Sequence, residues 1–506
     1  MQPDLRADTD VIEQILGLTR PDEEVYLVGG PVRDRLLNRA AHDLDFAVRG
    51  NAVRLARRVA NRLGGAFYVL DAGHDTARVL LNRADGGRLI LDFAGLRSED
   101  LSGDLLGRDF TVNAMALSLR DPDSLIDPLG GAADLRDGVL RACTETSLSG
   151  DPVRVLRAVR MAMTFQLHIE PQTLRWMKEA ADQLGRVSAE RKRDELFRLL
   201  GGHKVAAAVR MLDQIGALQQ VLPELDALKG VTQPPPHEYD VWEHTLQVLN
   251  ALEKLFGLLV GEYHHEAADL IYGTAVMRIG RYRQQLAAHF DQPLHPERTV
   301  RSLLFFSALY HDIAKPDTRS VEEGGRIRFL RHEREGGPVT ADRARQLALS
   351  RAEVERAQTT VSQHMCVHHL VQTGKPPTRR ALYRFWRTAG PAGVEVCLLS
   401  LADTLAKSAV PTYDQTWQDE VEVVRSLLEA WYERKEELVA PPRLISGTEL
   451  QQRLGMSPGP NIGRLLDAIR EKQAEGMIST ADEAWRYAEK WARSQSANHG
   501  GQQNES

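Results

Sequence analysis

The hydrophobic pattern changes once along the chain, and this change constrains the fold more than any other feature. Residues 25–95 alternate β-branched and aromatic runs, typical of strands, with amphipathic runs typical of helices. After about residue 145 the period is helical almost throughout, apart from Pro-rich breaks at 232–240 and 439–447. The sequence therefore predicts an α+β chain: a small head with a mixed sheet, followed by all-helical domains.

A chain of 506 residues is too long for a single hydrophobic core. We expect a head, two successive helical regions, a C-terminal helical region and a polar, disordered tail. The expected boundaries are 1–147, 148–232, 233–410, 411–493 and 494–506.

Composition excludes several classes of protein. The first 25 residues are acidic and lack the apolar run of a signal peptide, and no stretch is apolar enough to span a membrane. The three cysteines are far apart, so we expect no disulfide framework and a cytoplasmic protein. A net charge of −6 means that any nucleic-acid surface must be local. The sequence does not indicate the oligomeric state.

Two carboxylates interrupt a strand-like run in the head. In "DLDFAV", Asp43 and Asp45 are two residues apart, so in a strand they project from the same face. Such a pair repels unless a cation lies between the groups, and Mg²⁺ is bound by one or two carboxylates plus substrate phosphates. The preceding Gly29–Gly30 turn can bring backbone N–H groups against a phosphate. The alternative is a solvent-facing strand with alternating Asp.

Four further motifs follow in order: "GRDFTVNAMAL" (107–117), with its polar residues expected at the start of a helix, "DPLGGAADLRDGVLRA" (127–142), "DPVRVLRAVRMA" (151–162) and "SAERKRDELFRLL" (188–200). Together with the head motif they resemble the class II tRNA nucleotidyltransferase/poly(A) polymerase family, within the polymerase-β-like nucleotidyltransferases. The resemblance implies a polymerase-β-like head, a helical neck that binds the nucleotide base and RNA, and helical domains beyond.

The family's motifs carry residue roles with them. The resemblance implies that Asp43 and Asp45 are the catalytic, Mg²⁺-binding carboxylates, with Asp92 of "LILDF" as a third carboxylate or a buried structural one. Gly107 and Gly150 depart from the family pattern, which has arginine and glutamate there. The implied nucleotide-binding residues are Gly29, Gly30, Arg33, Asp34, Arg108, Asp109, Asn113, Asp151, Arg154, Arg157 and Arg160.

The implied reaction is attack of the tRNA 3′-hydroxyl on the α-phosphate of CTP or ATP, with two Mg²⁺ ions. Asp151 and Arg154 would read the Watson–Crick edge, since a carboxylate accepts from the exocyclic amine that C and A share. CCA addition or repair is the favoured interpretation. A poly(A) polymerase, a CC-adding or A-adding half-enzyme, and a phosphohydrolase with an RNA-binding head stay open, because specificity depends on a head loop near residues 71–90.

Histidines and aspartates recur in the region 233–410. Their order, with an adjacent His–Asp pair after an apolar helix, resembles the HD superfamily of metal-dependent phosphohydrolases. The resemblance implies one metal bound by four ligands, and a second metal or a phosphate at two further histidines. Imidazole with carboxylate suits Mn, Fe, Ni, Co or Zn. The four ligands are His244, His311, Asp312 and Asp403, and the two further residues are His332 and His364.

Three other segments have two interpretations each. Residues 376–390 interleave arginines with aromatic residues, as an RNA-binding helix or a core helix with an Arg stripe would. Residues 255–298 are expected to form an insertion, whose "EYHHEAAD" is a surface loop or another metal site. The "SPGPNIG" turn near residue 460 could hold a backbone phosphate or simply link two helices.

Overall fold

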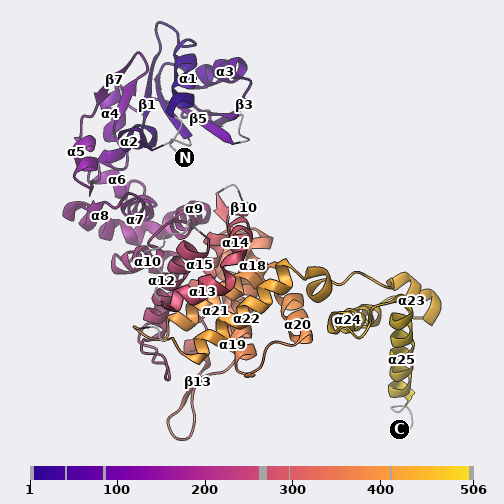
Figure 1. Cartoon of the computed structure of the whole chain (residues 1–506). Coiled ribbons are helices and arrows are strands. Elements are labelled where there is room, and N and C mark those ends of the chain that lie inside the picture. The colour runs from indigo at the N-terminus through magenta and orange to yellow at the C-terminus, as the bar shows by residue number, and fades with distance from the viewer. Residues whose placement is uncertain are drawn as a thin grey trace. The chain divides into compact units, whose positions relative to one another are not determined.

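The computed structural model describes residues 5–39, 43–83, 87–260, 270–295, 297–410 and 413–500. The chain forms two compact units (Figure 1). Unit 1 consists of Met1–Glu195 and Met211–Val221, and unit 2 of Leu196–Arg210 and Leu222–Ser506. Unit 1 contains a mixed sheet and unit 2 is mainly helical, which confirms the α+β class.

The sheet of unit 1 has seven strands in the order β3-β4-β5-β2-β1-β6-β7. All neighbours are antiparallel except β2 and β5, which run parallel. The strand-like runs of residues 25–95 form the first five of these strands. The strands are β1 (Glu24–Val28), β2 (Asp43–Arg49), β3 (Ala66–Asp71), β4 (Thr76–Asn82), β5 (Arg88–Gly95), β6 (Ala116–Ser118) and β7 (Asp121–Ile126).

Two predicted helices frame this sheet. Helix α2 (Gly30–Leu36) begins directly after Gly29, with Pro31 in its first turn. Helix α3 (Ala52–Leu63) buries Leu55 and Val59 against β4 and β5. It begins at an Asn51 side-chain cap and ends at Gly64 in the left-handed conformation. The helix therefore begins and ends at residues whose chemistry suits these two positions.

The segment after Asp109 is not the helix that the sequence analysis expected. A single 3₁₀ turn, η1 (Thr111–Asn113), leads directly into β6. The reason is burial on both sides, since Phe110, Val112 and Met115 are all fully buried. Nearly continuous burial of this kind suits an extended chain beside β1 better than a helix with one apolar face.

Further helices and short elements complete residues 5–221 of the chain. They are α1 (Leu5–Leu16), α4 (Leu101–Leu106), α5 (Gly131–Arg136), β8 (Val139–Leu140), α6 (Thr146–Ser149), α7 (Arg154–Phe165), β9 (His168–Ile169), α8 (Pro171–Ala181), η2 (Asp182–Arg186), α9 (Ala189–Leu200), α10 (Val205–Gln214) and α11 (Leu218–Val221).

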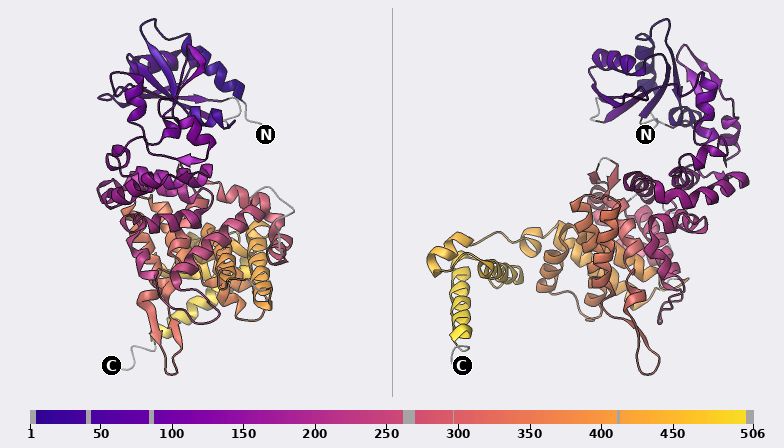
Figure 2. Two further views of the ribbon diagram at one scale, coloured as in Figure 1. Left: turned by 90° about the vertical axis from the view of Figure 1, so that its left-hand side faces the viewer. Right: turned by 180° about the vertical axis from the view of Figure 1, so that it is seen from behind.

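Unit 2 is built around α12, α15 and α21, whose side chains are buried almost along their whole length. The β12–β13 hairpin projects from these helices (Figure 2). The elements of unit 2 from residue 222 onward are η3 (Pro223–Leu228), α12 (Val241–Leu259), α13 (Leu270–Ile279), η5 (Gly280–Tyr282), α14 (Arg283–Phe290), β10 (Pro293–His295), β11 (Arg298–Thr299), α15 (Val300–Tyr310), α16 (Lys315–Thr318), β12 (Arg319–Val321), β13 (Ile327–Phe329), α17 (His332–Gln346), α18 (Arg351–Gln363), α19 (Cys366–Val371), α20 (Arg379–Ala389), η6 (Gly390–Ala392), α21 (Gly393–Leu405), α22 (Gln415–Tyr432), η7 (Lys435–Val439), α23 (Gly447–Leu454), α24 (Pro460–Glu475) and α25 (Ala481–Gly500).

The segment expected as an insertion packs against the rest of unit 2. The Trp417 indole of α22 donates to the carbonyl oxygen of Ile271 in α13, at 3.0 Å. The motif "EYHHEAAD" lies outside the described residues. Helix α25 continues to Gly500, past residue 494, where the sequence analysis expected disorder to begin. Among the described residues no helix combines the length and apolarity needed to cross a membrane.

Candidate active site and candidate metal centre

The parallel pairing of β2 and β5 brings carboxylates together in unit 1. Asp45 lies directly opposite Asp92 in the register of these strands, and Asp43 is exposed at the start of β2. The alternate residues Phe46 and Phe93 are buried and stack at 4.9 Å on the other face. The strand pattern thus places apolar side chains in the core and carboxylates on the opposite face.

This arrangement raises the pKa of Asp45. Burial, followed by the negative charge of Asp92, raises its pKa to about 6, although Arg108 acts in the opposite direction. Asp92 itself binds Arg78 through two hydrogen bonds of 2.8 Å each. Clustered carboxylates with a raised pKa are the donor set that a divalent cation stabilises. The residues present therefore fit Mg²⁺.

Gly29 is required beside these carboxylates. Its φ of 76° is unfavourable for other residues, and a Cβ atom would lie 3.1 Å from Nη1 of Arg108 and 3.7 Å from Oδ2 of Asp45. The glycine thus lets a cationic side chain approach the carboxylate group, next to the first turn of α2.

A polar chain links three of the predicted nucleotide-binding residues. Arg33 donates to Oδ1 of Asn113 at 2.6 Å, and Asn113 donates to Oδ1 of Asp109 at 3.1 Å. Arg33 also lies over the Phe165 ring at 4.1 Å and binds the carboxylate of Asp34. The two motifs from which these residues come are therefore connected by hydrogen bonds within unit 1.

Glu195 of α9 was not assigned a role from the sequence, yet it organises this network. Its Oε1 accepts from Arg157 at 2.9 Å and its Oε2 from Arg160 at 2.8 Å. Arg157 also donates to Asp109 at 3.1 Å. Although burial would raise the pKa of Glu195, the two arginines hold it below its ordinary value. The only sequence signal was its position within "SAERKRDELFRLL".

Asp151 and Arg154 lie together at the start of α7. The Nε of Arg154 is 3.6 Å from Oδ2 of Asp151, and Nη1 donates to the Ser147 carbonyl at 3.0 Å. Arg191 of α9, which sequence reasoning missed, donates to Oδ2 of Asp151 at 2.7 Å. The Nη2 of Arg154 lies 3.5 Å from the carbonyl oxygen of Gly107, and Gly150 directly precedes Asp151. The two glycines that depart from the family pattern are therefore next to this pair.

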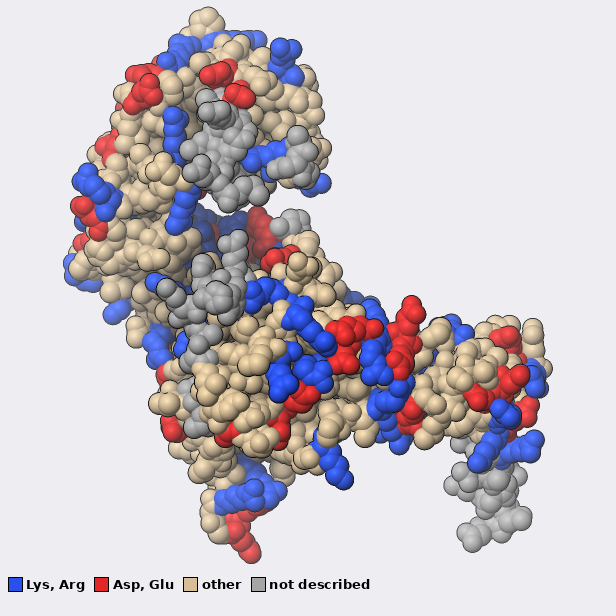
Figure 3. All heavy atoms as spheres, in the orientation of Figure 1, with Lys and Arg blue, Asp and Glu red and all other residues tan. Residues whose placement is uncertain are grey.

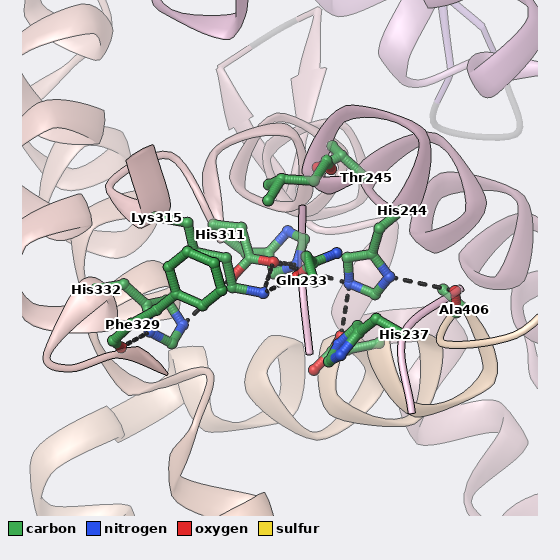
Figure 4. Close-up of polar contacts among 12 residues, drawn as sticks. Gln233, His237, His244, Thr245, His311, Lys315, Phe329, His332 and Ala406 are labelled. Atoms are coloured by element: carbon green, nitrogen blue, oxygen red, sulfur yellow. Dashed lines mark hydrogen bonds and ion pairs between the residues drawn. The ribbon is translucent and has the colours of Figure 1, made fainter. Parts of the chain in front are cut away.

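In unit 2 the six predicted histidines and aspartates converge. Figure 4 shows three of them, His244, His311 and His332. The two oxygens of Asp312 face different histidines. Oδ2 lies 3.1 Å from Nε2 of His311 and 3.8 Å from that of His244, whereas Oδ1 lies 3.2 Å and 3.8 Å from those of His332 and His364. Asp312 therefore joins two groups of potential ligands.

Asp403 completes the first of these groups. Its Oδ1 lies 2.9 Å from Nε2 of His244, and its Oδ2 lies 2.7 Å from Nε2 of His368. Burial would lower the pKa of His368, but Glu420 and Asp403 raise it to about 9. His368 and Glu420 had no motif that could have identified them from the sequence.

The cluster has the donor set of a metal centre. Within the described residues, Nε2 of His311 and Oδ2 of Asp312 are buried without a hydrogen bond of good geometry. Burial would raise the pKa of Asp312, but His311 and Lys315 hold it well below its ordinary value. The Lys315 ammonium lies 2.6 Å from Oδ2 and so places positive charge there. Imidazole nitrogens with ionised carboxylates fit a divalent transition metal.

Helix α20, expected either to bind RNA or to be a core helix, has core geometry. Tyr383, Phe385 and Trp386 are buried in unit 2. Arg380 and Arg384 both pair with Glu471 of α24, and basic and acidic side chains intermingle where these helices meet (Figure 3). The aromatic side chains are therefore not available to stack on bases in this structure.

Comparisons with known proteins agree with this arrangement. The family described as "Poly A polymerase head domain" matches residues 25–141, and "Probable RNA and SrmB- binding site of polymerase A" matches residues 166–229. The chain is 33% identical to an A-adding tRNA nucleotidyltransferase of Deinococcus radiodurans, over 92% of this chain and 95% of the relative. It is 31% identical to a CC-adding tRNA nucleotidyltransferase of Thermus thermophilus, over 93% and 94%.

The fold is shared with solved structures as well. A CCA-adding enzyme in complex with ATP aligns with a TM-score of 0.59 at 20% identity, covering 95% of this chain and 94% of that one. The ordered head motifs, the paired carboxylates of β2 and β5, and relatives matched over nearly their whole length all lead to one conclusion. The chain is a nucleotidyltransferase and belongs to the class II tRNA nucleotidyltransferase/poly(A) polymerase family.

Proposed function

We propose that the protein extends the 3′ end of tRNA with CMP and AMP taken from CTP and ATP. The observation that carries this proposal is the carboxylate group of β2 and β5, with Asp45 opposite Asp92 and Asp43 at the strand start. The tRNA specificity is supported by the names of the full-length relatives. On this proposal 1–147 is the nucleotidyltransferase head, 148–232 the neck, 233–410 the HD domain and 411–493 the C-terminal domain.

Asp43 and Asp45 would hold Mg²⁺ in the head. When bound, Mg²⁺ lowers the pKa of an attacking hydroxyl and neutralises triphosphate charge. Arg108, beside Asp45, is placed to bind phosphate oxygens, and the Gly29–Gly30 turn leaves room for the triphosphate at the start of α2.

Asp151 and Arg154 would read the base from the start of α7. Asp151 accepts the exocyclic amine common to cytosine and adenine, while Arg154 donates to ring nitrogen or carbonyl acceptors. In the structure Arg191 already donates to Asp151, so its exposed guanidinium fixes the carboxylate that the base must meet. Arg33, Asp34, Asp109, Asn113, Arg157 and Arg160 would support the sugar, triphosphate and base through the network that ends at Glu195.

A half-enzyme is the second candidate. The two relatives named above, each matched over more than nine-tenths of its length, are an A-adding and a CC-adding enzyme. A chain with either specificity would use the same carboxylates and the same base-reading pair, so this alternative changes the range of nucleotides and not the reaction.

The test uses three tRNA substrates that end before the CCA sequence, after the first C, and after the second C. Each is incubated with labelled CTP, ATP, UTP or GTP, alone and in pairs. CCA addition predicts C incorporation on the first two substrates and A incorporation on the third. A half-enzyme would extend only one class of substrate. Repeated A addition would indicate a poly(A) polymerase, and absence of incorporation on all three would refute the proposal.

We further propose a second activity in unit 2, the hydrolysis of phosphomonoesters or 2′,3′-cyclic phosphates. His244, His311, Asp312 and Asp403 would hold a transition metal, with His332 and His364 at a second metal or a phosphate. A metal held in this way lowers the pKa of bound water and supplies hydroxide. The protein contributes fixed, buried ligands, since all four principal side chains are less than one-tenth exposed.

The corresponding assay measures hydrolysis of a generic phosphoester and of 2′,3′-cyclic AMP with Mg²⁺, Mn²⁺, Ni²⁺ or Co²⁺. Metal analysis of the purified protein accompanies it. Stimulation by a transition metal that copurifies supports the proposal. Absence of both copurified metal and hydrolysis would leave the cluster as a structural element of unit 2.

A further inference from the structure

Five imidazole rings in unit 2 share one construction. In each ring Nδ1 lies at hydrogen-bond distance from a backbone carbonyl oxygen, which can only accept a hydrogen bond. When Nδ1 donates to that oxygen, Nε2 can offer its lone pair to a metal. The pairs are His237 with Pro234 at 3.2 Å, His244 with Ala406 at 3.2 Å, His311 with Ala308 at 2.8 Å, His332 with Phe329 at 2.9 Å, and His364 with Val361 at 2.7 Å.

Four of these rings belong to the cluster that the sequence predicted, and the fifth, His237, does not. It lies in the Pro-rich segment before α12, where no ligand motif is present. Nevertheless one of its ring nitrogens lies within 4.8 Å of ligand atoms of both His244 and Asp403. Its ring meets the His244 ring edge-on, with centroids 5.1 Å apart, as the close-up shows (Figure 4).

The segment that carries His237 is tied to the cluster on both sides. On one side the Lys315 ammonium, which pairs with Asp312, donates to Oε1 of Gln233 at 2.6 Å. On the other side the Glu238 amide donates to the Lys407 carbonyl at 2.9 Å. These bonds fix the backbone before and after the imidazole, so the position of the ring follows from the fold.

His237 also differs from the other four rings in its exposure. His244, His311, His332 and His364 are buried, whereas His237 is half-buried. It therefore lies on the solvent side of the His244–Asp403 pair, where a ligand can close a site after a metal has entered.

We propose that His237 is an additional ligand of the transition metal bound by His244, His311, Asp312 and Asp403. The inference rests on the metal centre proposed above for unit 2. A third imidazole makes the donor set richer in nitrogen, which favours Co²⁺, Ni²⁺, Zn²⁺ or Fe²⁺ over Mg²⁺. The ligand comes from the Pro-rich segment and not from the helices that supply the others.

The test uses Co²⁺ as the probe, because its visible d–d absorption reports the number and kind of ligands. Co²⁺ binding is titrated by calorimetry and by absorption for the full chain and four variants. His237→Ala and His237→Gln remove the imidazole, the second while keeping a group that can donate to Pro234. His311→Ala removes a central ligand, and His369→Ala removes an exposed histidine nearby as the matched control.

We expect both His237 variants to bind Co²⁺ roughly 10- to 100-fold more weakly, with a changed absorption band. His369→Ala should match the unaltered protein, and His311→Ala should lose binding. If the His237 variants keep both affinity and spectrum while His311→Ala loses them, the inference is overturned and the metal centre stands. If His311→Ala binds Co²⁺ as the unaltered protein does, the metal centre itself is overturned, and this inference with it.

Discussion

Asp45 belongs to the candidate active site and, in the metal-free protein, lowers the stability of the fold. Its carboxylate is partly buried opposite Asp92, and its pKa is about 6, well above the ordinary value of 3.8. In the metal-free protein, ionisation of this group is therefore less favourable in the folded chain than in the unfolded one. This destabilisation is absent below pH 4, develops as the pH rises to 6, and is complete above it.

We predict that Asp45→Asn stabilises the metal-free protein at pH 8 while abolishing nucleotide addition. The gain in the free energy of unfolding should be roughly 1–3 kcal/mol at pH 8 and should shrink as the pH falls from 6 to 4. Chemical denaturation in the presence of a chelator measures it. Asp123→Asn, at an exposed position of β7, is the control. Equal gains at pH 8 and pH 4 would contradict this explanation.

Loss of either strand carboxylate should stop the reaction. Asp43→Ala and Asp45→Ala are expected to fold normally and to incorporate no CMP or AMP, because a metal ligand supplies both position and charge. Labelled-nucleotide incorporation and thermal melting measure the two outcomes. Near-normal incorporation by either variant would exclude the catalytic assignment.

Substitution of the proposed base-reading residues Asp151 and Arg154 should change the choice of base. Asp151→Ala or Arg154→Ala should raise the ratio of UTP and GTP to CTP and ATP incorporation, since the lost hydrogen bonds discriminate by about 1–3 kcal/mol. Arg175→Ala, an exposed residue of α8 bonded to Gln172, is the control. Slower addition with an unchanged ratio would mean that the pair is structural.

Sequence reasoning identified residues that belong to ordered motifs, and it missed those that act through distant partners. The side-by-side arrangement of Asp43 and Asp45 follows from strand periodicity alone. In contrast, the position of Asp45 opposite Asp92 depends on the register between β2 and β5. Glu195 and His237 are single polar residues without a local pattern, and only the tertiary fold brings them to their sites.

At the scale of elements, periodicity predicted the strands and helices whose surroundings differ between their two faces. Strands β1, β2, β4 and β5 and helix α3 belong to this class, and all of them were found. Periodicity failed for the segment after Asp109, where burial on both sides removes the difference between faces. The Arg-rich face of α20 could not be assigned from its own sequence, because its partner α24 lies about 80 residues later in the chain.

Helix α9 acts as a support for α7 through one carboxylate. We predict that Glu195→Gln raises the KM for nucleotide roughly tenfold, because Arg157 and Arg160 lose a charged acceptor. Glu190→Gln on the exposed face of α9 is the matched control. Steady-state kinetics at saturating tRNA, together with thermal melting, separates weaker nucleotide binding from a loss of folded protein. An unchanged KM would contradict the supporting role.

The contact between α20 and α24 rests on exposed ion pairs. Glu471→Gln should therefore speed amide exchange in α24, while the free energy of unfolding changes by less than about 1 kcal/mol. Glu489→Gln, which breaks an ion pair with Arg453 inside the C-terminal helices, serves for comparison. Unchanged exchange in α24 would show that apolar packing alone holds this helix.

At the scale of the whole molecule, the two candidate sites lie in different units and share no residue. The substitutions His311→Ala and Asp312→Ala together should remove metal-stimulated hydrolysis and leave nucleotide addition intact. Asp43→Ala should do the reverse. Both activities are assayed on the same preparations, with metal content measured for each. Loss of both activities in either variant, with the fold preserved, would contradict two independent sites.

The order in which the chain builds its units has a consequence for modular exchange. The chain leaves unit 1 after Glu195, contributes residues 196–210 to unit 2, and returns to unit 1 for residues 211–221. A single cut or a single recombination junction therefore cannot separate the units cleanly. Any junction within residues 196–221 leaves part of one unit attached to the other unit. A functional chimera would therefore have to inherit this whole stretch, together with the segments of the two units that it joins, from one parent.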